Sequence, residues 1–144
     1  MRRIEEMHKD KVDESILEFL RKDSRESFVE IGKKLKLSES AIRHRVKNMV
    51  GSGTITKFTV EEEGGQPEAL VMVSADSSID TSKVSLKLTK LNAVKKIYEI
   101  TGQYDICVII QAPSIQEINA CIDDLRKITG VTDTNTVIIL KTIS

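Results

Sequence analysis

The hydrophobic residues of the first part of the chain recur at the spacing of amphipathic helices. Phe28, Ile31 and Leu35 are separated by three and four residues, which predicts a helix that buries one face. Ser27 and Glu30 form a capping box at its start, because the Ser27 hydroxyl can accept from the Glu30 N–H while the Glu30 carboxylate reaches back. We therefore expect a short helix that begins after Ser27.

A second amphipathic helix follows a tight turn, with Ser38 as its cap. Its buried face consists of apolar residues at helical spacing: Ile42, Val46, Met49 and Val50. At about 100° per residue, the opposite face carries only hydrogen-bonding and cationic side chains, with no acidic residue among them: Ser40, Arg43, His44, Lys47 and Asn48. The two helices predict a helix-turn-helix, in which the second is the recognition helix.

The flanking sequence completes a small domain. Upstream, Asp13 is expected to cap a third helix whose apolar residues complete a three-helix core: Ile16, Leu17 and Leu20. Downstream, residues 51–53 end the recognition helix, and residues 54–60 alternate like a strand. The pattern predicts a winged-helix-like helix-turn-helix domain over residues 1–57, with a connecting strand and linker over residues 58–67.

The second half of the chain is an internal repeat. A shift of 37 residues places residues 71–75 over 108–112 and residues 88–94 over 125–131, and each copy reads strand, helix, strand. Asp80 and Ser114 are placed to cap the two helices. The strands are expected at about residues 69–75, 94–101, 104–111 and 131–141. Two such units predict a ferredoxin-like βαββαβ domain over residues 68–144, with both helices on one face of an antiparallel sheet, and thus an α+β chain.

The strands of this sheet are apolar on both sides. Leu70 and Met72 alternate with Val71 and Val73, and a strand with one face in water should instead alternate apolar with polar residues. The face without helices therefore needs a cover. We favour the same sheet of a second chain, which gives a two-fold homodimer. The alternative is that the amino-terminal domain covers the face within one chain.

The overall charge of zero conceals a difference between the two halves. Residues 1–57 hold 14 Lys and Arg against 10 Asp and Glu, whereas residues 58–144 hold 8 against 12. A basic first half and a slightly acidic remainder fit a nucleic-acid reader joined to a domain that avoids nucleic acid. No apolar run approaches the roughly 18 residues of a membrane span, and the first residues lack an apolar signal core, so a cytoplasmic protein is expected.

The recognition helix supplies the candidates for contact with double-stranded DNA. Arg can bind guanine in a bidentate manner and Lys neutralises phosphate, so the base-edge candidates are Ser40, Arg43 and His44. Ser38 lies at the helix start, and the phosphate candidates are Arg45, Lys47 and Lys57. The alternative is an amphipathic helix whose charged face is merely solvated. Cys107 and Cys121 have no Cys-x-x-Cys partner and no nearby His, so we interpret both as small core residues and expect no metal site.

In this order and spacing, the motifs resemble the Lrp/AsnC family of bacterial and archaeal transcriptional regulators, from about Val12 to Ile143. The motifs that carry the resemblance are residues 13–17 with Leu20, residues 23–25, the helix pair with Leu37 and Ser38, residues 53–55, the loop 102–105 and residues 128–131. The resemblance implies dimers that often assemble into octamers. It also implies amino-acid effectors bound between protomers beside the loop 102–105.

The residues of that loop are compatible with an amino-acid ligand. Gly102 tolerates a positive φ and leaves backbone N–H groups to hold a carboxylate, while Asp105 could meet an ammonium. Further candidates are Tyr98, Glu99, Gln103 and Tyr104, together with Asp133, Thr134 and Thr136, which would face the loop from a neighbouring chain. The alternative is a turn cap for Asp105 and ordinary strand positions for the threonines. Because Glu99 and Asp105 are acidic and residues 76–80 are polar, a basic or polar amino acid such as lysine or glutamine is expected; no other cofactor is.

The sequence favours a sequence-specific regulator that binds a pseudo-palindromic operator over two other classes of function. Siroheme decarboxylases are similar in layout, but the histidines here are only His8 and His44, and residues 68–144 hold Arg126 as their single arginine. There is no paired-carboxylate, Cys/His or Gly-rich phosphate motif either, so an enzyme is not expected. A co-regulator whose helix-turn-helix contacts protein instead of DNA stays open.

Overall fold

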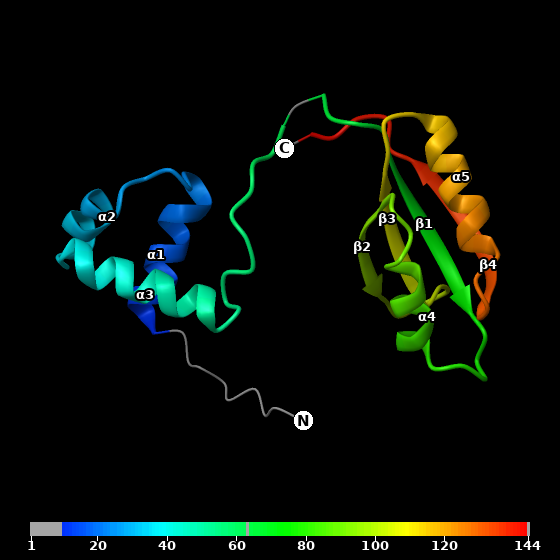
Figure 1. The fold of residues 1–144 in the computed structure, drawn as a ribbon, viewed down its shortest axis with the longest axis horizontal. Helices are drawn as coiled ribbons and strands as arrows, with labels where there is room; N and C mark the ends of the chain where they lie inside the picture. Colours follow the sequence, from blue (N-terminus) through cyan, green and yellow to red (C-terminus); the bar gives the residue numbers. More distant parts are fainter. Residues whose placement is uncertain (1–9, 63, 144) are drawn as a thin grey trace. The chain divides into compact units, whose positions relative to one another are not determined.

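The computed structural model describes residues 10–62 and 64–143, so His8 lies outside the described residues. The chain divides into two compact units, Met1–Glu61 and Glu62–Ser144. The first contains α1 (Lys11–Lys22), α2 (Phe28–Leu35) and α3 (Glu39–Gly51), shown in Figure 1. Their shared core consists of buried apolar residues, namely Ile16, Leu17, Leu20, Ile31, Ile42, Val46 and Met49. The predicted three-helix core is confirmed except for Val50, which was expected on the buried face and is 48% exposed.

The start of α1 differs from the prediction. Asp10 is the cap, because its Oδ1 accepts from the Asp13 N–H at 2.8 Å, and Asp13 lies inside the first turn. A cap residue satisfies the N–H three positions later, so the two aspartates at this spacing are cap and capped residue. At the start of α2, the Ser27 hydroxyl accepts from the Glu30 N–H at 3.2 Å as predicted, while the Glu30 carboxylate accepts from Lys33 Nζ at 2.8 Å.

The predicted strand over residues 54–60 is not formed. Its start is held by a hydrogen bond from the Ile55 N–H to the Met49 carbonyl at 2.9 Å, whereas Phe58 and Val60 are exposed. A strand needs a neighbouring strand for its backbone hydrogen bonds, and the described part of this unit contains only helices and loops. Alternation of side chains alone was therefore insufficient evidence for a strand.

The second unit has the predicted βαββαβ order. Its elements are β1 (Glu68–Ala75), α4 (Thr81–Leu88), β2 (Val94–Glu99), β3 (Ile106–Gln111), α5 (Ile115–Arg126) and β4 (Val131–Ile138). All strand pairs are antiparallel in the order β2-β3-β1-β4. Both helices cover the same face of the sheet (Figure 1). The strands β2, β3 and β4 are shorter than predicted, because their outer residues belong to loops.

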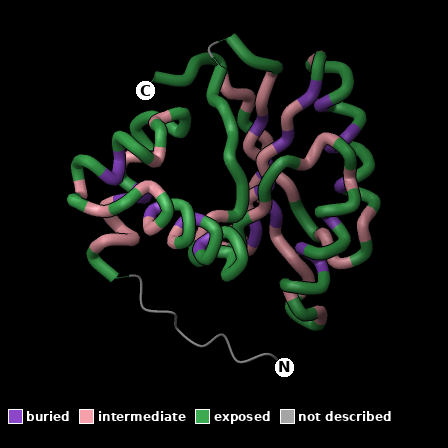
Figure 2. Tube along the Cα trace, turned by 60° about the vertical axis from the view of Figure 1, so that its left-hand side comes forward, coloured by how far each residue is buried: buried purple, intermediate pink, exposed green. Residues whose placement is uncertain are grey.

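The two faces of the sheet differ in their cover. Along β1, buried residues alternate with partly buried ones, and the buried set of β1 and β3 packs under the helices: Ala69, Val71, Val73, Ile106, Val108 and Ile110. Figure 2 shows this alternation as short buried stretches along strands and helices, separated by exposed connections. The register pairs Val71 with Val108 on the helix-covered face. The next pair along the two strands, Met72 with Cys107, lies on the opposite face. None of the described helices is long and apolar enough to span a membrane.

Candidate nucleic-acid interface and effector region

The recognition helix α3 is placed by a tight turn after α2. The Leu37 N–H donates to the Gly32 carbonyl at 2.8 Å, and Lys36 adopts a left-handed conformation with φ of 58°. Ser38 then caps α3 as predicted, since its Oγ accepts from the Ala41 N–H at 3.1 Å. The turn hydrogen bond and the Ser38 cap together fix where α3 begins relative to α2.

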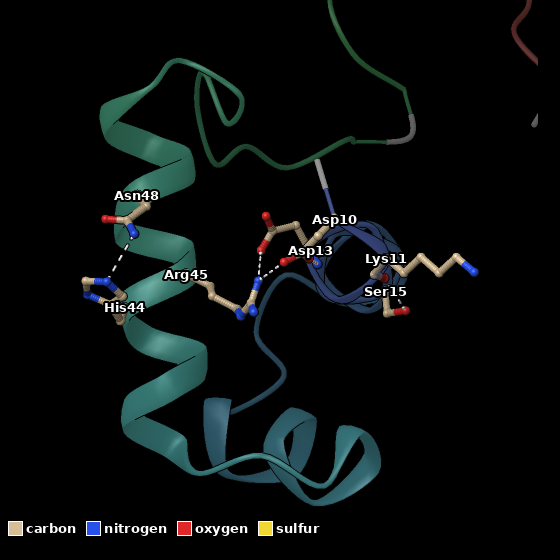
Figure 3. Close-up of polar contacts among 7 residues, drawn as sticks. All are labelled: Asp10, Lys11, Asp13, Ser15, His44, Arg45 and Asn48. Carbon is tan, nitrogen blue, oxygen red and sulfur yellow. Dashed lines mark hydrogen bonds and ion pairs between the residues drawn. The ribbon is translucent and has the colours of Figure 1, made fainter. Parts of the chain in front are cut away.

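The outward face of α3 lies opposite its buried residues. It consists of the exposed residues Ser40, His44, Lys47 and Asn48. The Asn48 amide Nδ2 lies 3.2 Å from His44 Nε2, one helical turn away (Figure 3). The prediction did not select Asn48 as a contact, although its spacing from His44 was a usable signal. This stripe can offer donors and acceptors to base edges and one cation to phosphate.

Arg43 lies on the flank of α3 nearer α2. Its guanidinium pairs with Glu39 one turn earlier and lies over the Phe28 ring, 5.4 Å from the ring centroid. The expectation of no acidic residue on this side of the helix is therefore wrong, because Glu39 reaches Arg43 at the i,i+4 spacing. Arg43 remains 65% exposed, so its guanidinium is oriented by these contacts and still accessible.

Arg45 lies on the other flank, facing α1. Its Nη1 lies 2.6 Å from Asp10 Oδ2 and 2.9 Å from Asp13 Oδ1, and Figure 3 shows the side chain directed away from His44 and Asn48. The hydrogen bond from Arg45 lowers the pKa of Asp10, and the same contacts raise the pKa of Arg45. The guanidinium is thus engaged within the domain, and a phosphate contact of Arg45 stays a prediction. The remaining candidate, Lys57, is exposed in the loop after α3.

The loop between β2 and β3 is closed by backbone hydrogen bonds. The Ile100 N–H donates to the Asp105 carbonyl and the Asp105 N–H donates to the Val73 carbonyl, both at 2.9 Å. The Asp105 carboxylate accepts from the Ala75 N–H at 2.8 Å. Asp105 therefore ties the loop to the end of β1, which is a contact between distant segments and not the local turn cap that the sequence offered as the alternative. Its Oδ1 has no hydrogen-bond partner within the described residues.

The tip of the same loop exposes backbone donors. Gly102 has a φ of 115°, a conformation that favours glycine. Within the described residues, the N–H groups of Gly102, Gln103 and Tyr104 have no hydrogen-bond acceptor. Consecutive unpaired N–H groups form a concavity that suits an anion such as a carboxylate.

The other predicted ligand residues lie on two different faces of the sheet. Tyr98 and Asp133 lie on the face without helices, because they pair with Cys107 and Ser74. On the helix-covered face, Ser82 Oγ donates to Glu99 at 3.2 Å and Arg126 Nε donates to Thr134 at 3.1 Å. The Thr136 hydroxyl, on that same face, is buried and has no partner within the described residues. Because successive strand residues point to opposite faces, residues 133–136 divide between the two faces of the sheet, and their approach to the loop of a neighbouring chain stays a prediction.

The face without helices is apolar at its centre. It carries the partly buried residues Leu70, Met72, Cys107 and Ile109, with Val137 and Tyr98 exposed beside them. Cys121, by contrast, belongs to the core between helices and sheet, as predicted. The second cysteine, Cys107, lies on the open face, so only one of the two is a core residue. Burial raises the pKa of both thiols.

Both units of the chain match models of known protein domains. Residues 10–50 match the AsnC-type helix-turn-helix domain, and residues 68–144 match the Lrp/AsnC ligand binding domain. The chain belongs to the Lrp/AsnC family. It is 43% identical to the HTH-type transcriptional regulator LysM of Saccharolobus solfataricus over 92% of this chain and 94% of that one. The resemblance found in the sequence is confirmed, and the family is one of transcriptional regulators, not enzymes.

Solved structures of the family share the fold. E. coli AsnC superposes with a TM-score of 0.75 at 27% identity, covering 92% of this chain and 93% of that one. A feast or famine regulatory protein from M. tuberculosis, complexed with L-methionine, superposes with a TM-score of 0.81 at 21% identity, covering 94% of each chain. In this Lrp/AsnC chain, the helix-turn-helix unit is therefore the DNA-binding part.

Proposed function

We propose that this Lrp/AsnC regulator reads a pseudo-palindromic DNA sequence as a homodimer, and that an amino acid bound near the loop 102–105 modulates it. The observation that carries the proposal is the exposed polar stripe of α3, formed by Ser40, His44, Lys47 and Asn48. None of these side chains contributes to the core. A helix that keeps its apolar residues inside and presents donors, acceptors and a cation outside suits the major groove.

The homodimer is supported by the open face of the sheet. Met72 and Ile109 are partly buried at the centre of a face that neither helix covers, and Val137 on the edge strand β4 is 51% exposed on the same face. Burying such a face against a second copy removes apolar surface from water, and a two-fold axis presents the same surface twice. Two recognition helices in a dimer would then reach half-sites about 34 to 36 Å apart. Further assembly into octamers is an expectation from the family resemblance.

The effector is supported by the chemistry of the loop 102–105. Three unpaired N–H groups can donate to a carboxylate, and the second oxygen of Asp105 can accept from an ammonium. Glu99 is hydrogen-bonded to Ser82 on the helix-covered face, so it is not one of the ligand-binding groups proposed at this loop. A basic or polar amino acid such as lysine or glutamine remains the proposed ligand class, on the polar residues 76–80 and on Asp105, whose free oxygen can accept from an α-ammonium or from a polar side chain of the ligand.

The DNA proposal is tested with a duplex selected by the protein from a random-sequence pool, and with a scrambled duplex of equal composition. His44→Ala should reduce the preference for the selected duplex, because a base-edge contact is lost. Lys47→Ala should weaken binding to both duplexes and flatten the salt dependence, because a phosphate contact is lost. Identical behaviour of the two variants would contradict these roles. Failure of the unaltered protein to retard any duplex at low salt would favour the co-regulator alternative.

The effector proposal is tested by thermal shift with each of the twenty amino acids. A ligand that binds only the folded state raises the melting temperature in a concentration-dependent manner. Basic or polar amino acids should stabilise the protein, and Asp105→Asn should abolish that shift while it keeps an acceptor for the Ala75 N–H. Stabilisation by apolar amino acids alone would reject the proposed ligand class.

A further inference from the structure

The contact between Arg45 and two aspartates joins the recognition helix to α1. One guanidinium nitrogen, Nη1, bridges Asp10 Oδ2 at 2.6 Å and Asp13 Oδ1 at 2.9 Å (Figure 3). Asp10 uses its other oxygen to accept from the Asp13 N–H at 2.8 Å, which fixes the two carboxylates relative to each other. We call these three residues the clasp. Arg45 is 35 residues from Asp10 and 32 residues from Asp13 in the chain, so the clasp links separate elements.

The clasp supplies directional contacts between α1 and α3, which the apolar core does not. The core of this unit is apolar, with Ile16, Ile42 and Val46 buried, and hydrophobic contacts are non-directional. Hydrogen bonds to charged groups are directional and roughly twice as strong as neutral ones. The side chains of Arg45 and Asp13 are only 33% and 21% exposed, so the pair is less screened than an ordinary surface ion pair. The clasp therefore restrains the rotation of α3 about its own axis.

The charge of the clasp argues against a phosphate ligand. Arg45 contributes one positive charge and the two aspartates contribute two negative charges, which leaves a net charge of about −1 on the cluster. An aspartate with its ordinary pKa is already ionised at neutral pH, and the hydrogen bond from Arg45 lowers the pKa of Asp10 further. Lys47, in contrast, forms no ion pair within the described part of the chain. A phosphate approaching Arg45 would meet two carboxylates, whereas Lys47 presents an unneutralised cation.

We propose that Arg45 is a positioning residue, which Asp10 and Asp13 hold so that α3 presents its polar stripe to DNA, and which does not itself bind phosphate. The inference rests on the DNA binding proposed above. It predicts that removing negative charge from Asp10 and Asp13 weakens DNA binding. Simple electrostatics predicts the opposite, since a less acidic surface attracts DNA more strongly.

The test compares Arg45→Met, the pair Asp10→Asn with Asp13→Asn, and the triple variant, all in the full chain. Asn is as good a helix cap as Asp, so α1 keeps its start in the Asn variants. Arg21→Met is the matched control, because Arg21 makes a 2.9 Å ion pair with Glu14 within α1. Affinity for the selected duplex is measured by fluorescence anisotropy over a range of salt, and circular dichroism verifies folding.

The clasp predicts binding about two- to tenfold weaker for Arg45→Met and for the Asn pair, the range expected when one member of an ion-pair network is lost. The triple variant should be no weaker than either, Arg21→Met should bind normally, and the salt slope should be unchanged. Tighter binding by the Asn pair, unaltered binding by Arg45→Met, or a salt slope reduced by about 0.9 in Arg45→Met would overturn the inference.

The failure of the inference is distinguishable from the failure of the proposed function. If the unaltered protein selects no duplex, DNA reading itself is refuted. If it selects one and Lys47→Ala behaves as a phosphate contact, DNA reading stands, and the Arg45 and Asp variants decide the inference alone. Should Arg45→Met fail to fold, the Asn pair still decides, because its expected sign is opposite under the two interpretations.

Discussion

Substitution of Gly32 by alanine should destabilise the helix-turn-helix unit, although alanine is the better helix former. Gly32 is buried in α2, and a Cβ built there would lie 2.5 Å from the Leu37 carbonyl oxygen. That atom belongs to the backbone of the turn, so it cannot rotate away. Relief of the clash requires the turn to shift, and with it the hydrogen bond from the Leu37 N–H to the Gly32 carbonyl.

The expected magnitude follows from three contributions. Forcing a methyl group into a packed site costs about 1–3 kcal/mol. Weakening the turn hydrogen bond costs about 1 kcal/mol more. The higher helix propensity of alanine offsets about 1 kcal/mol of this loss in stability. The free energy of unfolding of this unit should therefore fall by about 1–3 kcal/mol, and its melting temperature by at least about 4 °C for a unit of this size.

Gly51→Ala is the matched control, because a Cβ at Gly51, the last residue of α3, would meet no atom within 4 Å. It should leave the stability unchanged or raise it by up to about 1 kcal/mol. Hydrogen exchange of peptides from α2 and α3 measures the stability of this unit separately from the rest of the chain. Equal protection in Gly32→Ala and Gly51→Ala would refute the steric argument.

Three further predictions concern the other contacts described above. Asp105→Ala should lower the free energy of unfolding of the second unit by about 1–3 kcal/mol, because the Ala75 N–H loses its acceptor, whereas Asp105→Asn should not; urea unfolding of both variants checks this. The pKa of Asp10 is lower in the folded state than its ordinary value of 3.8, so its contribution to stability is present above that pH and lost as the pH falls below it; the acid limb of thermal stability should be shallower in Arg45→Met. Val137→Asp, on the open sheet face, should shift the proposed homodimer to monomer in analytical ultracentrifugation at micromolar concentration, whereas Leu86→Asp at an exposed position of α4 should not.

The elements that sequence predicted well are those fixed by local signals. Ser27, Ser38 and Ser114 each cap the predicted helix, because a hydroxyl three residues before an N–H needs no distant partner. The order of strands and helices followed from the internal repeat. The strand predicted over residues 54–60 is absent, because a strand depends on a neighbouring strand that the local sequence does not specify.

The candidate site was only partly predictable, because several of its side chains are oriented by residues far along the chain. The polar stripe of α3 follows from helical spacing and was visible in the sequence. The partners of Arg45 are 32 and 35 residues away, and the acceptor role of Asp105 involves a backbone N–H 30 residues away. No periodicity encodes such pairs. The residues 133–136 were grouped by composition, while the pleat of β4 divides them between two faces.

The loop 102–105 and the open sheet face are connected through the end of β1, which gives the proposed regulation a physical basis. The Asp105 carboxylate accepts from the Ala75 N–H, and the Asp105 N–H donates to the Val73 carbonyl. Their neighbours along β1, Met72 and Ser74, lie on the open face. A ligand that moves the loop would therefore act on the strand that a partner sheet would contact. Coupling between two sites is reciprocal, so a ligand that favours one arrangement of two copies must bind that arrangement more tightly.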